Sequence, residues 1–307
     1  MVVSSACAAD QDGKLVNSSR VSLSESAIKA LESVEPDIGA ILNQTDTKAI
    51  TYLSDGLKVR GYLAAPKQGA NLPCVIWNRG GNRESGALSD TNACSRLGRI
   101  ASWGYVVIAS QYRGNAGGEG KEEFGGKDVD DVLNLLPVLQ SLPQADPTRV
   151  GMCGYSRGGM MTYLALARTD RIAAAVVGFG LSDAFETVAS RPEMETNVLA
   201  ELVPDFQQNR AAALEARSAV RWVDKLNKNT PILLLHGTAD WRVNPMQAIQ
   251  MATALYQNKH PFRFVLFEGA AHGLGEFRPE VNRLTRDWLD RYVRDRQHWP
   301  SLEPHGN

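Results

Sequence analysis

The sequence has 307 residues, of which 43% are hydrophobic and 22% are charged, the balance of an ordinary globular protein. Its 33 basic and 34 acidic residues give a formal net charge of −1, which indicates neither nucleic acid nor an anionic membrane as a partner. The apolar runs are strand-sized, well short of the roughly 18 residues that a membrane-spanning helix needs.

The first residues are small and polar. We expect residues 1–20 to be either a disordered tail or the remnant of an export signal. Ala6 and Ala8 stand in the A-x-A arrangement of a signal cleavage site, but no apolar segment precedes them. A signal remnant would imply a secreted or periplasmic protein and a mere tail a cytoplasmic one, and both alternatives stay open.

After this segment, strand and helix patterns alternate. A helix is predicted over residues 24–33, and a β-hairpin over 49–53 and 57–64 around the turn Ser54-Asp55-Gly56. From the spacing of apolar residues, strands are expected at 73–77, 105–110, 149–154, 172–179, 231–236 and 262–267, and helices at 88–103, 127–142, 157–167, 246–256 and 279–294.

This order predicts an α/β protein with a mostly parallel sheet and helices on both faces. We expect one domain over residues 21–307. Residues 182–229 show helical patterns but no strand, between two core strands, so we predict a helical lid inserted there; these residues are called the lid segment below.

The four cysteines do not indicate a metal site or a disulfide framework, because no CxxC pair is present. Cys74 lies early in one predicted strand and Cys153 late in another, so parallel strands would hold the two thiols apart. We expect Cys74, Cys94 and Cys153 to be small buried side chains. No motif implies a metal or an organic cofactor.

Residues 154–158 read Gly-Tyr-Ser-Arg-Gly, the G-x-S-x-G pattern, between a predicted strand and a predicted helix. The pattern is typical of a nucleophile elbow, a turn so tight that glycine fits best two positions before and after the serine. A glycine-rich phosphate loop is the alternative, but the segment spells neither of its patterns. The sequence therefore predicts the α/β-hydrolase fold with Ser156 as nucleophile.

A nucleophilic serine needs a base, and five histidines are available. His272 lies in a small-residue loop directly after the last predicted strand, where its imidazole can reach the nucleophile. His236 ends a buried strand, which favours a structural, hydrogen-bonded role. His260 stands at a strand entrance, and His298 and His305 lie in a polar C-terminal tail.

The base needs an acid that holds its tautomer. Asp240 follows the strand before the last, and the chain order Ser156, Asp240, His272 is the order of this fold. A turn or helix-capping role is the alternative for Asp240.

An oxyanion hole needs two backbone donors. We expect one from the N–H of Arg157 and the other from the loop Arg79-Gly80-Gly81-Asn82, with Gly81 before Gly80, because glycines let the main chain approach a substrate. The alternative for this loop is a tight turn with no catalytic part.

Together these residues resemble the catalytic domain of the prolyl oligopeptidase family of serine peptidases, over roughly residues 73–292. The resemblance rests on residues 111–114, 125–131, 154–159, 236–240 with 243–245, and 271–273. It implies that Ser156, Asp240 and His272 are the family's catalytic residues and that residues 125–128 are structural.

Two departures qualify the resemblance. Well-studied members carry a β-propeller ahead of this domain, whereas fewer than 50 residues precede the hairpin here, against the roughly 160 that four blades need. We therefore expect no propeller, which argues against a dipeptidyl peptidase. Several members also use a tyrosine before the glycine pair as an oxyanion donor, where this sequence has Arg79.

Two functions share this machinery: a peptidase on short peptides, which the resemblance implies, and a carboxylesterase on small or aromatic esters. A binding protein on a hydrolase scaffold is a third, against which the complete triad argues. The expected partner is a short peptide or a small-molecule ester, and the oligomeric state stays open. The candidate substrate contacts are Tyr155, Phe179, Phe185 and Trp241. Aromatic side chains near an active site are more often plain core, so we expect no more than two of these four to face the acyl group.

Overall fold

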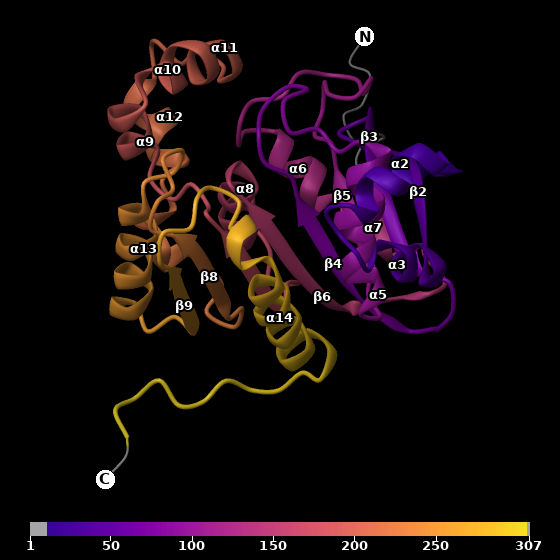
Figure 1. Cartoon of the computed structure of the whole chain (residues 1–307). Coiled ribbons are helices and arrows are strands. Elements are labelled where there is room, and N and C mark those ends of the chain that lie inside the picture. Colours follow the sequence, from indigo (N-terminus) through magenta and orange to yellow (C-terminus); the bar gives the residue numbers. More distant parts are fainter. Residues whose placement is uncertain (1–10, 306–307) are drawn as a thin grey trace. The chain divides into compact units, whose positions relative to one another are not determined.

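A computed structural model describes residues 11–305, so the prediction about Ala6 and Ala8 lies outside the described residues. The chain divides into two compact units (Figure 1). The first runs to Glu122 and includes Lys127–Thr148, and the second comprises Glu123–Gly126 and the chain from Arg149 onward. One domain with an inserted lid therefore stays a prediction.

The first unit is built on five strands in the order β1-β2-β3-β5-β4. The pairs β1–β2, β2–β3 and β3–β5 are antiparallel, and the pair β5–β4 is parallel. The hairpin is confirmed, with both turn residues, Asp55 and Gly56, at positive φ (51° and 75°), as a type I′ turn requires. The strands are β1 (Leu15–Arg20), β2 (Thr45–Ser54), β3 (Leu57–Pro66), β4 (Leu72–Asn78) and β5 (Val106–Ser110).

Strand β1 corrects the expectation of a disordered tail for residues 15–20. Its sequence, Leu-Val-Asn-Ser-Ser-Arg, is mostly polar and exposed, so it carries no hydrophobic signal. It is held instead by main-chain pairing with β2, from Leu15 opposite Tyr52 to Arg20 opposite Lys48. Such hydrogen bonds depend on the neighbouring strand and not on residue type.

The helices of the first unit are shorter than predicted. The helix predicted over 24–33 is α2 (Glu25–Glu32), whose N-cap Ser24 accepts a hydrogen bond from the Ala27 amide at 3.2 Å. The helix predicted over 127–142 is two helices, because Pro137 lacks an amide hydrogen and fits only in the first turn of a new helix. The others are α3 (Ile38–Gln44), α4 (Asp90–Asn92), a π-helical turn (Ala93–Leu97), α5 (Gly98–Ser102), α6 (Asp128–Leu133) and α7 (Leu135–Gln140).

A buried ion pair joins three parts of this unit. The Arg113 guanidinium donates to both carboxylate oxygens of Asp131 on α6, with Nη2–Oδ1 at 2.8 Å, and to Asp55 at 2.7 Å. The Arg113 amide also donates to Asp131 at 2.7 Å, and the Asp131 side chain is fully buried. The pair therefore ties residues 111–114 to α6 and to the hairpin turn.

We expect Arg113→Met to lower the free energy of unfolding by about 3–5 kcal/mol, because it leaves the Asp131 carboxylate buried without its cation. Urea unfolding followed by circular dichroism measures this loss. The double variant Arg113→Met/Asp131→Asn should lose less than the sum of the two single variants. A single-variant loss below about 1 kcal/mol, typical of an exposed pair, would contradict the expectation.

The second unit carries four parallel strands in the order β6-β7-β8-β9. All residues of β7 and β8 are buried, so both faces of these strands are covered, as predicted. The strands are β6 (Ala145–Tyr155), β7 (Ala174–Gly178), β8 (Ile232–Gly237) and β9 (Phe262–Phe267), and the helices that cover them are α8 (Arg157–Leu166), α13 (Pro245–Gln257) and α14 (Arg278–Leu289), which continues as a π-helical turn (Asp290–Arg294).

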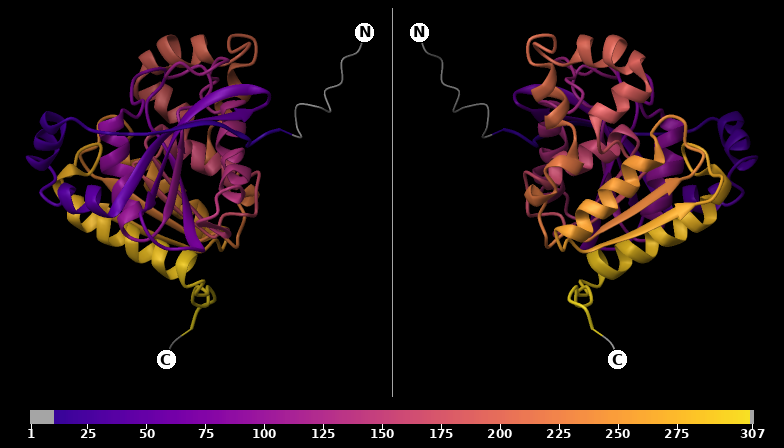
Figure 2. Two further views of the ribbon diagram at one scale, coloured as in Figure 1. Left: turned by 90° about the vertical axis from the view of Figure 1, so that its right-hand side faces the viewer. Right: turned by 90° about the vertical axis from the view of Figure 1, so that its left-hand side faces the viewer.

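The lid segment is helical and contains no strand in residues 182–229, all of which the structure describes. Its helices gather at one end of the second unit, above β8 in Figure 1 and above α14 in both views of Figure 2. They are α9 (Ala184–Ser190), α10 (Pro192–Met194), a π-helical turn (Glu195–Leu199), α11 (Ala200–Leu202), α12 (Arg210–Ala216) and two 3₁₀ turns (Ala219–Arg221 and Val223–Lys225).

The start of the lid segment is anchored to α13 by one buried side chain. Gln247 Oε1 accepts hydrogen bonds from the amides of Ser182 and Asp183, both at 3.0 Å, and its Nε2 donates to Glu186 at 2.6 Å. Asp183 in turn caps α9 by accepting from the Phe185 amide at 2.9 Å. The first turn of α9 is therefore fixed to the helix that follows β8.

Cys74, Cys94 and Cys153 are free and buried, which confirms the expectation for all three. In the described part of the chain, no helix has the length and apolar character needed to cross a membrane.

Candidate active site

The strands of the second unit end at a common edge. In the parallel register, Tyr155 of β6 lies opposite Gly178 of β7, and Gly237 of β8 lies opposite Phe267 of β9. The loops that follow these strands therefore leave the same side of the strands. They carry Ser156, Asp240 and His272, so all three predicted triad residues belong to this unit.

Ser156 sits in the sharp turn that the motif predicts. Its backbone has φ 58° and ψ −125°, a conformation that a residue with a side chain rarely adopts. Its amide donates to the Gly178 carbonyl at 3.0 Å, and its carbonyl accepts from the Gly159 amide at 2.9 Å. A Cβ atom on Gly154 would lie 2.0 Å from the Gly158 carbonyl oxygen, which explains glycine two positions before the serine.

The structure brings Asp240 and His272 together. The Asp240 Oδ2 atom lies 2.8 Å from His272 Nδ1, and Oδ1 accepts from the amides of Arg242 at 2.9 Å and Val243 at 3.1 Å. Burial of this carboxyl by itself raises its pKa, but hydrogen bonds from His236, His272 and the Val243 amide outweigh burial and hold the pKa well below its usual range. Asp240 is therefore an anion at neutral pH, and because a carboxylate oxygen only accepts, Nδ1 is the donor of its hydrogen bond with His272.

His236 has the structural role expected of it. Its Nε2 lies 2.9 Å from the Val243 carbonyl oxygen and 3.3 Å from Asp240 Oδ2. Both partners accept hydrogen bonds, so Nε2 must carry the hydrogen. His236 therefore holds the loop of Asp240 and Val243 in place.

Aromatic side chains continue from the imidazole toward the elbow. The Phe179 ring lies 4.6 Å from the His272 ring in an edge-on arrangement and 5.6 Å from the Tyr155 ring, measured between centroids.

Within residues 11–305, no hydrogen bond joins the Ser156 hydroxyl to His272. Such catalytic hydrogen bonds often tighten only when substrate binds.

The predicted oxyanion donors lie in different units. Arg157 begins α8, and its guanidinium lies 4.6 Å from the centroid of the Phe124 ring. Gly80 and Gly81 belong to the first unit, with Gly81 at φ 68° in a tight loop. The pairing of these donors stays a prediction.

The Arg79 side chain binds main-chain carbonyl groups of the first unit. The side chain is fully buried and donates to the carbonyl oxygens of Gln111 at 3.0 Å, Gly80 at 3.1 Å and Arg83 at 2.9 Å. The guanidinium thus braces the glycine-containing turn from within.

The other two aromatic candidates lie against cations. The Phe185 ring of α9 lies 4.2 Å from the Arg221 guanidinium. Trp241 is 68% exposed, with the guanidinium groups of Arg191 and Arg242 at 5.4 and 5.1 Å from its ring. Their predicted contact with substrate, like that of Tyr155 and Phe179, stays a prediction.

Sequence reasoning missed a brace on the elbow helix. Buried Arg217, next to α12, donates to the carbonyl oxygens of Phe124 at 2.6 Å and Glu123 at 2.8 Å. A Cβ atom on Gly125 would lie 2.9 Å from both Met160 and Leu164 of α8. The segment 123–126 is thus held closely against α8, which gives the expected structural role of residues 125–128 a physical basis. No local pattern signals it, because Arg217 is more than 90 residues away from its partners.

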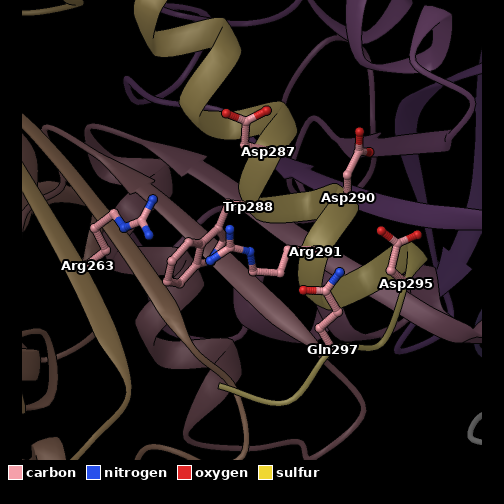
Figure 3. Close-up of a pocket in the computed structure, with 7 residues that line it drawn as sticks. All are labelled: Arg263, Asp287, Trp288, Asp290, Arg291, Asp295 and Gln297. Carbon is pink, nitrogen blue, oxygen red and sulfur yellow. The ribbon is translucent and has the colours of Figure 1, made fainter. Parts of the chain in front are cut away.

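A pocket of about 270 Å³ lies elsewhere on the second unit, between β9 and the end of α14. Figure 3 shows Arg263 facing Trp288, with their contact at 5.5 Å from guanidinium to ring. Its lining contains no predicted site residue: Arg263, Asp287, Trp288, Asp290, Arg291, Asp295 and Gln297. The pocket is therefore separate from the candidate active site. Within residues 11–305, no cluster of three or more His, Cys, Asp or Glu side chains could hold a metal ion.

Known proteins resemble this chain over most of its length. Residues 93–296 match the model of the prolyl oligopeptidase family. YtmA, an uncharacterized peptidase of Bacillus subtilis (strain 168), is 30% identical over 248 residues, which cover 80% of this chain and 93% of the relative.

Two solved structures share the fold. A puromycin-hydrolyzing peptidase of Mycobacterium tuberculosis is 27% identical, with a TM-score of 0.63 over 78% of this chain and 38% of its own. The acylaminoacyl peptidase of Pyrococcus horikoshii is 22% identical, with a TM-score of 0.70 over 83% of this chain and 43% of its own. The chain thus spans less than half the length of either. The elbow, the parallel strands and these matches agree: the protein is a serine hydrolase with the α/β-hydrolase fold, and the chain belongs to the prolyl oligopeptidase family.

Proposed function

We propose that the protein is a serine peptidase of short peptides and that Ser156, His272 and Asp240 form its catalytic triad. The observation that carries the proposal is the buried Asp240 anion hydrogen-bonded at 2.8 Å to His272 Nδ1, on the same strand edge as the Ser156 elbow. An anion in this position holds the imidazole in the tautomer that can accept a proton from serine.

The reaction follows from these positions. The Ser156 oxygen attacks the scissile carbonyl carbon while His272 Nε2 takes the hydroxyl proton, which gives a tetrahedral oxyanion and an imidazolium beside Asp240. The Arg157 amide, with Gly81 as the proposed second donor, stabilises the oxyanion. His272 then gives its proton to the leaving amine, which leaves the acyl group as an ester on Ser156. In the second half of the reaction water attacks this ester while His272 takes the proton of water, and His272 then returns the proton to the Ser156 oxygen as the acid is released.

The names of the similar structures suggest the substrate class. One is called a puromycin-hydrolyzing peptidase and another an acylaminoacyl peptidase. We therefore propose peptides and amides that carry a single aminoacyl or acylaminoacyl group on the acyl side.

A fluorophosphonate probe and a substrate panel test the proposal together. The wild-type protein should be labelled at Ser156 and should cleave puromycin, alanyl-p-nitroanilide or acetylalanyl-p-nitroanilide. Absence of labelling, or labelling that persists in Ser156→Ala, would exclude a serine mechanism at this site. Rapid turnover of p-nitrophenyl acetate and butyrate with no cleavage of any amide would assign a carboxylesterase instead.

A further inference from the structure

Phe179 has an unusual backbone for its residue type. Its φ is 39°, in the left-handed region that favours glycine, and it follows directly after β7. Its amide donates to the Leu235 carbonyl of β8 at 2.6 Å, and the residue is 9% exposed. A bulky residue adopts this conformation only when its surroundings impose it, and such residues cluster at functional sites.

The segment that carries Phe179 is fixed to the nucleophile. The carbonyl of Gly178 accepts from the Ser156 amide at 3.0 Å, and the amide of Leu181 donates to the Ser156 carbonyl at 3.3 Å. Gly178 precedes Phe179 in the chain and Leu181 follows it. The backbone that carries Phe179 is therefore held next to Ser156 by two main-chain hydrogen bonds.

The His272 loop is held on both sides of the histidine. The Ala270 carbonyl accepts from the Ala239 amide at 3.0 Å, the Ala271 carbonyl accepts from the Leu274 amide at 3.1 Å, and the Ala271 amide donates to the Glu276 carboxylate at 3.2 Å. Within residues 11–305, no hydrogen bond involves the main chain of His272 itself. The hydrogen bond from Nδ1 to Asp240 fixes one point of the imidazole but leaves its plane free to swing about that point. The Phe179 ring, 4.6 Å away and inclined by 67°, limits this swing.

We propose that Phe179 is a positioning residue that sets the imidazole plane of His272 relative to Ser156. It links the elbow, to which Gly178 before it and Leu181 after it are hydrogen-bonded, with the base, against which its ring packs. The inference rests on the proposed role of His272 as the base. It assigns Phe179 to the geometry of the triad and not to the binding of the acyl group.

Phe179→Leu removes the ring, whereas Phe179→Tyr keeps it and serves as the matched control. We expect kcat of the leucine variant to fall by about 10–100-fold, since small misplacements of catalytic groups cost this much, with KM within about twofold of wild type. The rate constant of fluorophosphonate labelling should fall by the same factor. Phe179→Tyr should keep most of the activity, and Phe264→Leu on β9 should match wild type.

Proton NMR gives a readout that does not depend on turnover. The His272 Nδ1 proton, hydrogen-bonded to Asp240, should give a downfield signal that is lost in Asp240→Asn. In Phe179→Leu this signal should broaden through faster exchange with water, while the thermal unfolding midpoint stays near that of wild type. If the leucine variant does not fold, Phe179→Met provides a ring-free side chain of similar volume.

An unchanged kcat together with an unchanged Nδ1 signal in the ring-free variant would overturn the inference. So would a rise in KM at constant kcat, which would make Phe179 a substrate contact. If Ser156→Ala still reacts with the probe, the proposed function fails, but the response of the Nδ1 signal to Phe179 remains a separate result.

Discussion

Replacing Ser156 with alanine is expected to lower kcat by about 10⁶-fold on a good substrate, because the attacking oxygen is lost and His272 and Asp240 have no proton to move. Steady-state kinetics on the best substrate of the panel measure this effect. KM should change little, since the hydroxyl contributes to bond formation and not to ground-state binding.

The backbone at Ser156 provides a matched control for this variant. Its φ of 58° is strained for serine and alanine alike but not for glycine. Ser156→Gly should therefore be as inactive as Ser156→Ala and more stable by about 1 kcal/mol, the order of the cost of such a backbone. Loss of activity accompanied by a lowered thermal midpoint in both variants would point to misfolding instead.

Replacing Asp240 with asparagine is expected to lower kcat by about 10⁴-fold, the size of effect that loss of the correct imidazole tautomer has in a serine hydrolase triad. The amides of Arg242 and Val243 would bind the oxygen of the new side chain, so its NH₂ group would face His272. The imidazole would then accept at Nδ1 and hold its hydrogen on Nε2, where it cannot take the proton of Ser156. A kcat within about tenfold of wild type would contradict the assignment of Asp240 as the triad acid.

The same carboxylate affects stability at low pH. Burial raises the pKa of Asp240, but its hydrogen bonds lower the pKa by more than burial raises it. The folded state therefore binds a proton at Asp240 less readily than the unfolded state does. The stabilisation is fully present above the unfolded pKa of about 3.9 and is lost as pH falls below it toward the folded value. The difference in unfolding free energy between wild type and Asp240→Asn, followed by urea titration, should therefore shrink below about pH 4.

Regions with a local pattern were predicted well. The hairpin at Asp55-Gly56, the fully buried strands β7 and β8 and the turn around Ser156 depend on residues close together in the chain. The buried, hydrogen-bonded position of His236 also followed from local position, because it ends a buried strand, whereas the role of His272 as base stays a proposal.

Features held by distant partners were not predicted. Strand β1 is mostly polar and owes its form to pairing with β2, and the brace from Arg217 to Phe124 joins main-chain carbonyls to a side chain far along the sequence. The contact of Phe179 with His272 left only a faint signal, namely the glycines on both sides of that phenylalanine.

The sequence by itself determined the order of strands and helices, the elbow and the order of Ser156, Asp240 and His272, because periodicity, tight turns and residue chemistry are local properties. Only the tertiary structure decided which ring rests on the imidazole, which amides hold the acid and which guanidinium braces the elbow helix. These contacts use main-chain groups and ring faces that most residue types can offer, so their choice depends on the positions that the folded chain brings together.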